Sequence, residues 1–291
     1  MIKIPIYKGV GTALVTPFKK DKTIDLDGFI RLINFQTDND IDALIVLGTT
    51  SESPTISDEE FNMLVKTAIK HKKHAKIIVG IGKNDTMSSI RLAKKAQKLG
   101  ADALMAVTPY YNKPPQQGLI THFKAIAKAV KLPIMLYNVP SRTGVHLDAK
   151  SCLELSKIKN IIALKEAGGD FSHILKVRAL CGENLHLYSG NDDNVTAMMS
   201  LGAFGVVSVV ANAFPQQVRL ITESALREDY ITSTKAQCEL LPVIESAFSM
   251  TNPIPIKAML SKIGICEEWV RLPLATMSKI KKKKLKYPIN N

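Results

Sequence analysis

The chain has 291 residues, of which 46% are hydrophobic and 22% are charged, so it can build a large core and does not have the composition of a disordered protein. No apolar run reaches the ~18 residues that a membrane span needs. Most of the net charge of +13 comes from lysines scattered along the chain, whereas nucleic-acid interfaces cluster basic residues among aromatics. We therefore expect neither a membrane nor a nucleic acid as a partner.

Short apolar segments rich in β-branched residues alternate along the chain with longer amphipathic segments. The longer segments have helical spacing, as in Asp25–Gln36, Gly118–Ala129 and Phe171–Leu180, and Ser57 followed by Glu60 predicts a capping box at a helix start. The short segments predict eight strands: Gly11–Thr16, Ala43–Leu47, Lys76–Gly80, Ala103–Thr108, Ile134–Tyr137, Ile161–Lys165, Leu185–Ser189 and Gly205–Ser208.

The fold class follows from this alternation. Strands that are apolar almost throughout suit a parallel sheet covered on both faces, and eight strand–helix units predict a closed (β/α)8 TIM barrel. A doubly wound open sheet is the alternative, but no G-x-G-x-x-G fingerprint follows the first strand. We assign residues 1–224 to the barrel and 225–291 to a C-terminal appendage of extra helices. Its basic run, 279–286, is interpreted as a solvated last helix, with contact to an acidic partner as the alternative.

Few residues are spaced for metal or cofactor binding. The four cysteines form no C-x-x-C pair, which argues against a zinc ribbon or disulfide scaffold and favours a reducing cytosol. There is no H-E-x-x-H motif and no Walker loop, and Asp192-Asp193 is interpreted as a turn or helix cap. Glycine-rich turns after the last two strands leave a phosphate-binding aldolase as a minor alternative. We expect no cofactor and no metal.

Lys165 is the most informative single residue, because it follows the apolar run Ile161–Leu164 without a break. Active sites of (β/α)8 barrels lie at the C-terminal ends of the strands, so this lysine is expected at the barrel mouth. It either extends to water or acts as a nucleophile that attacks a carbonyl to form an imine. Burial would favour the second role, since desolvation lowers the pKa of a lysine from ~10.4 and leaves the amine neutral.

Other polar residues gather at the same ends of neighbouring predicted strands. Tyr137 ends the strand before that of Lys165, and Thr49 and Thr50 follow the second strand. Hydroxyl groups of this kind can carry the protons that imine formation needs without adding charge, although packing is the usual role of a lone tyrosine. Arg142, just past Tyr137, is either a carboxylate-binding arginine or a surface loop residue.

These segments together resemble the dihydrodipicolinate synthase / N-acetylneuraminate lyase family of pyruvate-dependent class I aldolases. The resemblance runs from about Gly9 to Pro273 and rests on these stretches, in this order: LVTPF, VLGTTSES, VTPYYNKPPQQGL, HFKAIA, LYNVPSRTG, IIALKEAGG, YSGNDD, GVVSV, TNPIPIKAML and RLPL. It implies a TIM barrel enzyme of the cytoplasm, a homotetramer built as a dimer of dimers, that uses no cofactor.

The resemblance also implies catalytic roles. Lys165 would form the imine with pyruvate, and Tyr137 would donate and accept the protons. Thr49 and Tyr111 would complete the proton relay, with Tyr111 reaching into the site of a neighbouring subunit.

Substrate-binding roles follow from the same resemblance. Thr50 and the backbone of Val207 would hold the carboxylate and methyl end of pyruvate. Arg142 would bind the carboxylate of the second substrate, L-aspartate 4-semialdehyde. The implied reaction is aldol addition of the pyruvate enamine to this aldehyde, followed by ring closure, in lysine and diaminopimelate synthesis.

Three points remain open in the sequence. Thr49-Thr50 and Arg142 favour the synthase over a sialic acid lyase or a 2-keto-3-deoxy sugar acid aldolase of the same family. An inactive barrel that binds a partner through its lysine-rich tail is the alternative of a different class. Ser51 stands where the family usually has glycine; if that position needs a positive φ, serine costs roughly 1 kcal/mol or more there.

Overall fold

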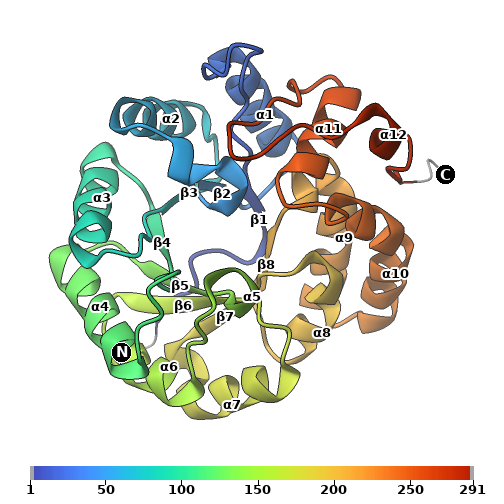
Figure 1. Cartoon of the computed structure of the whole chain (residues 1–291). Helices are drawn as coiled ribbons and strands as arrows, with labels where there is room; N and C mark the ends of the chain where they lie inside the picture. Colours follow the sequence, from blue (N-terminus) through green and yellow to red (C-terminus); the bar gives the residue numbers. More distant parts are fainter. Residues whose placement is uncertain (1–2, 289–291) are drawn as a thin grey trace.

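Eight parallel strands close into a barrel in the order of the sequence, with helices around the outside (Figure 1). This computed structural model describes residues 3–288. The strands are β1 (Gly9–Ala13), β2 (Ala43–Val46), β3 (Lys76–Gly80), β4 (Ala103–Val107), β5 (Ile134–Asn138), β6 (Ile161–Glu166), β7 (His186–Ser189) and β8 (Gly205–Ser208). The predicted closed barrel is confirmed, and the open sheet is wrong because β1 pairs with β8.

The helices follow the strands in regular alternation, and extra helices come after the eighth unit. They are α1 (Leu26–Asp38), α2 (Asp58–His71), α3 (Thr86–Leu99), α4 (Gln116–Ala129), α5 (Pro140–Thr143), α6 (Ala149–Ser156), α7 (Phe171–Cys181), α8 (Val195–Ser200), α9 (Pro215–Leu226), α10 (Tyr230–Ala247), α11 (Ile254–Lys262) and α12 (Lys279–Lys282). Short 3-10 turns include η1 (Thr49–Ser51), η2 (Ser53–Thr55), η3 (Gly182–Asn184), η4 (Asp192–Asn194) and η5 (Val210–Asn212). None of the helices within residues 3–288 is long and apolar enough to cross a membrane.

Local sequence signals explain most element bounds. β3 and β8 have the predicted bounds, and α2 begins directly after its N-cap Ser57. The predicted capping box is formed: the Glu60 amide donates to Ser57 Oγ (3.2 Å) and the Ser57 amide donates to Glu60 Oε2 (2.9 Å). The first strand is the exception, since it begins at Gly9 rather than Gly11 and ends at Ala13. Gly9 pairs with Gly205, where a Cβ would meet the Gly9 carbonyl oxygen at 1.9 Å, and an apolar-run criterion overlooks such a glycine pair.

The barrel has two cores. One lies between the strands and the surrounding helices, and the other fills the barrel interior. Tyr7, which lies just before β1 at the amino-terminal end of the barrel, packs on Tyr188 of β7 with ring centroids 4.6 Å apart, and the Tyr188 hydroxyl donates to the Tyr7 carbonyl oxygen (2.6 Å). This packing fills the interior at that end, and active sites of such barrels lie at the C-terminal ends of the strands.

The segment after α9 covers one side of the barrel (Figure 1). α9 packs on β1 and β8 as the eighth barrel helix, α10 packs on α9, and α11 contacts η5 and α10. The predicted extra C-terminal helices are therefore confirmed. We propose 225, in the last turn of α9, as the start of the appendage; its residues 289–291 lie outside the described part of the chain. The basic run includes the short exposed α12.

Candidate active site

Lys165 lies at the C-terminal end of β6, inside the barrel mouth. In the sheet register it sits between Tyr137 of β5 and Tyr188 of β7, and it is only 5% exposed. A cavity of about 190 Å³ opens beside it, lined among others by Thr49, Tyr137 and Arg142. The apolar run before Lys165 buries the strand on both faces and thereby carries the amine into this cavity.

The electrostatics of the cavity favour a neutral amine. Burial lowers the pKa of Lys165 to about 7; the Asp192 carboxylate opposes this shift and the Arg142 guanidinium adds to it. A large fraction of the amine is therefore unprotonated near neutral pH. This is the state in which a lysine can attack a carbonyl carbon.

Tyr137 lies directly beside the amine, with Lys165 Nζ 4.2 Å from the centroid of its ring. Burial raises the pKa of this phenol to about 12, against the opposing effects of Arg142 and a hydrogen bond with Thr49. The phenol therefore stays protonated at neutral pH and can donate a proton next to Lys165.

Neighbouring residues shape the space around Lys165. A Cβ on Gly190 would lie 3.0 Å from Lys165 Cε and 2.7 Å from Ala167 Cβ, so glycine leaves room for the lysine stem. Glu166, the next residue of β6, lies outside the cavity and accepts hydrogen bonds from Asn138 Nδ2 (2.8 Å) and the Gly168 amide (2.6 Å). Because successive side chains of a strand point to opposite faces, the Glu166 carboxylate and the Lys165 amine lie on different sides of β6.

The turn after β2 brings two threonines to the barrel mouth. Thr49 is exposed and lines the cavity, and buried Thr50 accepts a hydrogen bond from Asn252 Nδ2 (2.9 Å). Positive φ angles in this turn are found at Leu47 (63°) and Glu52 (56°) but not at Ser51, which lies in η1. The expected strain at Ser51 is therefore absent. Instead its hydroxyl accepts from the Leu47 amide (3.0 Å) and donates to the Leu14 carbonyl oxygen (2.7 Å).

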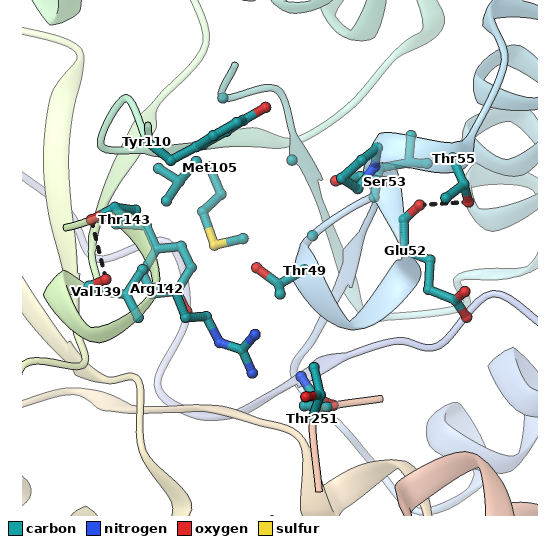
Figure 2. Close-up of a pocket in the computed structure, with 18 of the residues that line it drawn as sticks. Thr49, Glu52, Ser53, Thr55, Met105, Tyr110, Val139, Arg142, Thr143 and Thr251 are labelled. Carbon is teal, nitrogen blue, oxygen red and sulfur yellow. Dashed lines mark hydrogen bonds between the residues drawn. The ribbon is translucent and has the colours of Figure 1, made fainter. Parts of the chain in front are cut away.

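Arg142 comes from α5, a single turn that begins at Pro140, separated from the end of β5 by one residue. The Thr143 hydroxyl donates to the Val139 carbonyl oxygen (3.2 Å) and holds this turn. Figure 2 shows the guanidinium group extending into a pocket, between Thr49 and Thr251. This larger cavity, about 340 Å³, adjoins the first and shares Thr49, Tyr137 and Arg142 with it. A cation at this point can bind a carboxylate beside Lys165.

Two predicted site residues do not line either cavity. Tyr111 is 87% exposed with a φ of 73°, whereas its neighbour Tyr110 lines the larger cavity. Val207 is fully buried in the barrel interior, and Val209 lines the smaller cavity in its place. The structure thus brings Lys165, Tyr137, Thr49, Thr50 and Arg142 together within one chain.

Asp192 and Asn252 contribute to the site without having been predicted as site residues. Asp192 is buried and accepts hydrogen bonds from the Ser208 hydroxyl and the Val209 amide (2.9 Å), so it fixes the turn after β8 while its charge acts on Lys165. Asn252 lines both cavities. In the sequence, only the position of Asn252 within the TNPIPIKAML stretch pointed to a role in the site. Among residues 3–288, no three His, Cys, Asp or Glu side chains form a group that could hold a metal ion.

Comparisons with known proteins agree with this geometry. A sequence profile of the Dihydrodipicolinate synthetase family matches residues 6–291. A 4-hydroxy-tetrahydrodipicolinate synthase of Caldicellulosiruptor saccharolyticus is 42% identical, covering 99% of both chains, and one of Exiguobacterium sibiricum is 45% identical, covering 94% of both.

Solved structures extend the similarity to the fold. A dihydrodipicolinate synthase of Thermotoga maritima superposes with a TM-score of 0.93 at 38% identity, covering 96% of both chains. The enzyme of Acinetobacter baumannii, solved in complex with pyruvate, gives 0.93 at 36% identity, also covering 96% of both. With a buried lysine at the mouth of a closed barrel and similarity along nearly its whole length, the chain belongs to the dihydrodipicolinate synthetase family.

Proposed function

We propose that this chain condenses pyruvate with L-aspartate 4-semialdehyde to give 4-hydroxy-tetrahydrodipicolinate, a step of lysine and diaminopimelate biosynthesis. The observation that carries the proposal is the buried Lys165 at the open end of the barrel, with a pKa of about 7. The relatives named above are synthases of this kind, which favours the reaction over cleavage of sialic acid or keto-deoxy sugar acids.

The reaction begins with attack of the neutral Lys165 amine on the C2 carbonyl carbon of pyruvate. The carbinolamine loses its oxygen as water and becomes an imine, and Tyr137 supplies and recovers the protons, with Thr49 as its hydrogen-bond partner. Loss of a proton from the methyl carbon gives an enamine, which forms the new carbon–carbon bond with the aldehyde. The amino group of the second substrate then displaces Lys165 from the imine carbon and closes the ring.

Substrate binding uses the remaining polar groups of the mouth. Thr50 holds the carboxylate of pyruvate, and Arg142 holds the carboxylate of the semialdehyde through its planar fork. The role expected for the backbone of Val207 gains no support from the geometry, because Val207 lines neither cavity. Two carboxylates in one small cavity also need the positive charge that Arg142 supplies.

We further propose a cytoplasmic homotetramer, a dimer of dimers, in which Tyr111 completes the proton relay of a neighbouring subunit. Two observations support this role. Tyr111 is 87% exposed in the single chain, and it adopts a left-handed backbone conformation that is unfavourable for a bulky residue. An interface that holds the ring would offset that cost.

The proposal is tested by borohydride reduction of the wild-type protein in the presence of pyruvate, followed by peptide mapping by mass. We expect a pyruvyl adduct on the peptide that contains Lys165. A protein that turns over aspartate semialdehyde without any trapped adduct would refute the imine mechanism. Faster turnover of keto-deoxy sugar acids than of aspartate semialdehyde would assign the chain to the alternative activity.

The pH dependence of imine formation follows from the pKa of Lys165. Below about pH 7 the amine becomes protonated and unreactive, so the rate of adduct formation with pyruvate is expected to rise from pH 5.5 to 8 with a midpoint near 7. Stopped-flow trapping at fixed pyruvate measures this. A midpoint near pH ~10.4, the pKa of a lysine in water, would contradict the predicted effect of burial on Lys165.

Arg142→Ala is expected to raise KM for aspartate semialdehyde by about 10- to 100-fold, since a charge-assisted hydrogen bond to the substrate carboxylate is lost. Borohydride trapping of pyruvate at saturation should remain complete, because Lys165 and Tyr137 are untouched. Arg142→Lys is the matched variant: it keeps the charge, loses the fork and should give an intermediate KM. Equal KM values for all three proteins would exclude Arg142 from substrate binding.

A further inference from the structure

The turn that carries Thr49 and Thr50 is tied to the C-terminal appendage through a buried charge. Glu52 joins η1 to η2 in the left-handed conformation (φ 56°, ψ 39°), and its residue exposure is only 3%. Figure 2 shows its carboxylate directed away from Thr49. Glu52 lines the larger cavity together with Arg142, but it does not line the smaller cavity that contains Lys165. Its effect on the smaller cavity, which Thr49 and Thr50 line, is therefore exerted through the backbone of the turn.

Both carboxylate oxygens of Glu52 have partners from the appendage. Lys257 Nζ, on α11, donates to Glu52 Oε1 (2.6 Å), and the Arg271 amide donates to Glu52 Oε2 (2.9 Å). Lys257 is 0% exposed; its Nζ also donates to the Trp269 carbonyl oxygen (2.8 Å) and lies 4.2 Å from the centroid of the Phe18 ring. Glu52 and Lys257 are thus buried, and both the carboxylate oxygens and the ammonium group have hydrogen-bond partners.

A second tie reaches the same turn from the residues just before α11. Asn252 Nδ2 donates to Thr50 Oγ1 (2.9 Å). A side-chain amide nitrogen can only donate, so the Thr50 hydroxyl acts as acceptor here and its own hydrogen remains free to donate elsewhere. To bind a carboxylate, the Thr50 hydroxyl has to act as the donor. The hydrogen bond from Asn252 leaves the Thr50 hydroxyl free to do so.

We propose that the buried Glu52–Lys257 pair is a positioning device for pyruvate, which holds the Thr49–Thr50 turn in the geometry that binds the keto acid. The inference rests on the proposed function, because it takes Thr50 as a ligand of the pyruvate carboxylate. Replacing a buried ion pair by uncharged groups of similar shape is often neutral for stability, so stability alone gives weak grounds for such a pair. Its directional contacts, together with Asn252, instead restrict where the turn can lie.

The test is a double variant, Glu52→Gln with Lys257→Met, which removes both charges and leaves no unpaired ion. We expect a folded protein whose KM for pyruvate rises about tenfold, because small displacements of binding groups have large effects in such sites. KM for aspartate semialdehyde should change less than twofold, and borohydride trapping at saturating pyruvate should still label Lys165 fully. A general loss of rigidity would raise the KM values of both substrates and not that of pyruvate alone.

The matched control is the ion pair of Lys72 with Asp102 (2.6 Å), which joins the end of α2 to the start of β4 at the opposite end of the barrel. Lys72→Met with Asp102→Asn removes this pair, whose side chains are more exposed (28% and 24%) than those of Lys257 and Glu52 (0% and 2%). We expect a lower thermal midpoint and an unchanged KM for pyruvate in this protein. If it raises the pyruvate KM as much as the site variant does, the effect is structural and the proposal is overturned.

Two further outcomes are decisive. A folded Glu52→Gln, Lys257→Met protein with wild-type KM for pyruvate would overturn the positioning role. Should the double variant fail to fold, Glu52→Asp decides: it keeps both charges but shortens the side chain by one methylene, so about a threefold higher pyruvate KM supports the proposal and a wild-type KM overturns it. Failure of the proposed function is recognised separately, as a wild-type protein that traps no pyruvate, and would overturn both.

Discussion

Lys165→Ala is expected to lower kcat by at least about 10³-fold and to abolish the borohydride-trapped pyruvyl adduct, because the covalent route through the imine is lost. No other lysine within residues 3–288 lines the smaller cavity, so no second amine can replace it. Intact-mass measurement after reduction with pyruvate and steady-state assay with aspartate semialdehyde give the two readouts.

The control for this experiment is an exposed lysine far from the mouth, such as Lys235→Ala on α10, which should trap pyruvate like the wild type. Circular dichroism shows whether the Lys165→Ala protein is folded. Removal of the amine should not unfold it, since the nearby Asp192 carboxylate keeps its hydrogen bonds from Ser208 and Val209. A folded Lys165→Ala protein that still captures pyruvate and turns over normally would refute the assignment of the nucleophile.

Tyr137→Phe is expected to lower kcat by about 10²- to 10³-fold, the usual contribution of a positioned proton donor. Phenylalanine keeps the ring that packs 4.2 Å from Lys165 Nζ, so the variant isolates the hydroxyl from the packing. Adduct formation should become slow but still reach completion after long incubation with pyruvate. Pre-steady-state trapping against time measures the difference.

Tyr188 provides a matched control, because it flanks Lys165 from β7 as Tyr137 does from β5. Its hydroxyl is directed to the Tyr7 carbonyl oxygen (2.6 Å), away from the cavity. Tyr188→Phe should leave kcat within about twofold while losing about 1 kcal/mol of stability with the buried hydrogen bond. Equal losses of kcat in the two variants would show that the Tyr137 hydroxyl has no special role in proton transfer.

The arrangement of the site could be predicted to the extent that it depends on strand ends. Lys165, Tyr137 and Thr49 each follow an apolar run, and in a closed parallel barrel all such positions meet at one mouth. Tyr111 and Val207 do not follow from this argument within one chain. Tyr111 extends outward, and Val207 lies one layer below the cavity, in the interior core.

Patterning along the chain was sufficient to specify the closed barrel, the start of α2 and the lysine at the end of β6, because burial on both faces and capping are local properties. It could not specify the start of β1, the left-handed residue at Glu52, or the pair of Glu52 with Lys257. These depend on contacts between residues up to 205 positions apart. The pKa of about 7 at Lys165 is of the same kind, since desolvation is produced by all the chain segments that surround the amine once the barrel has closed.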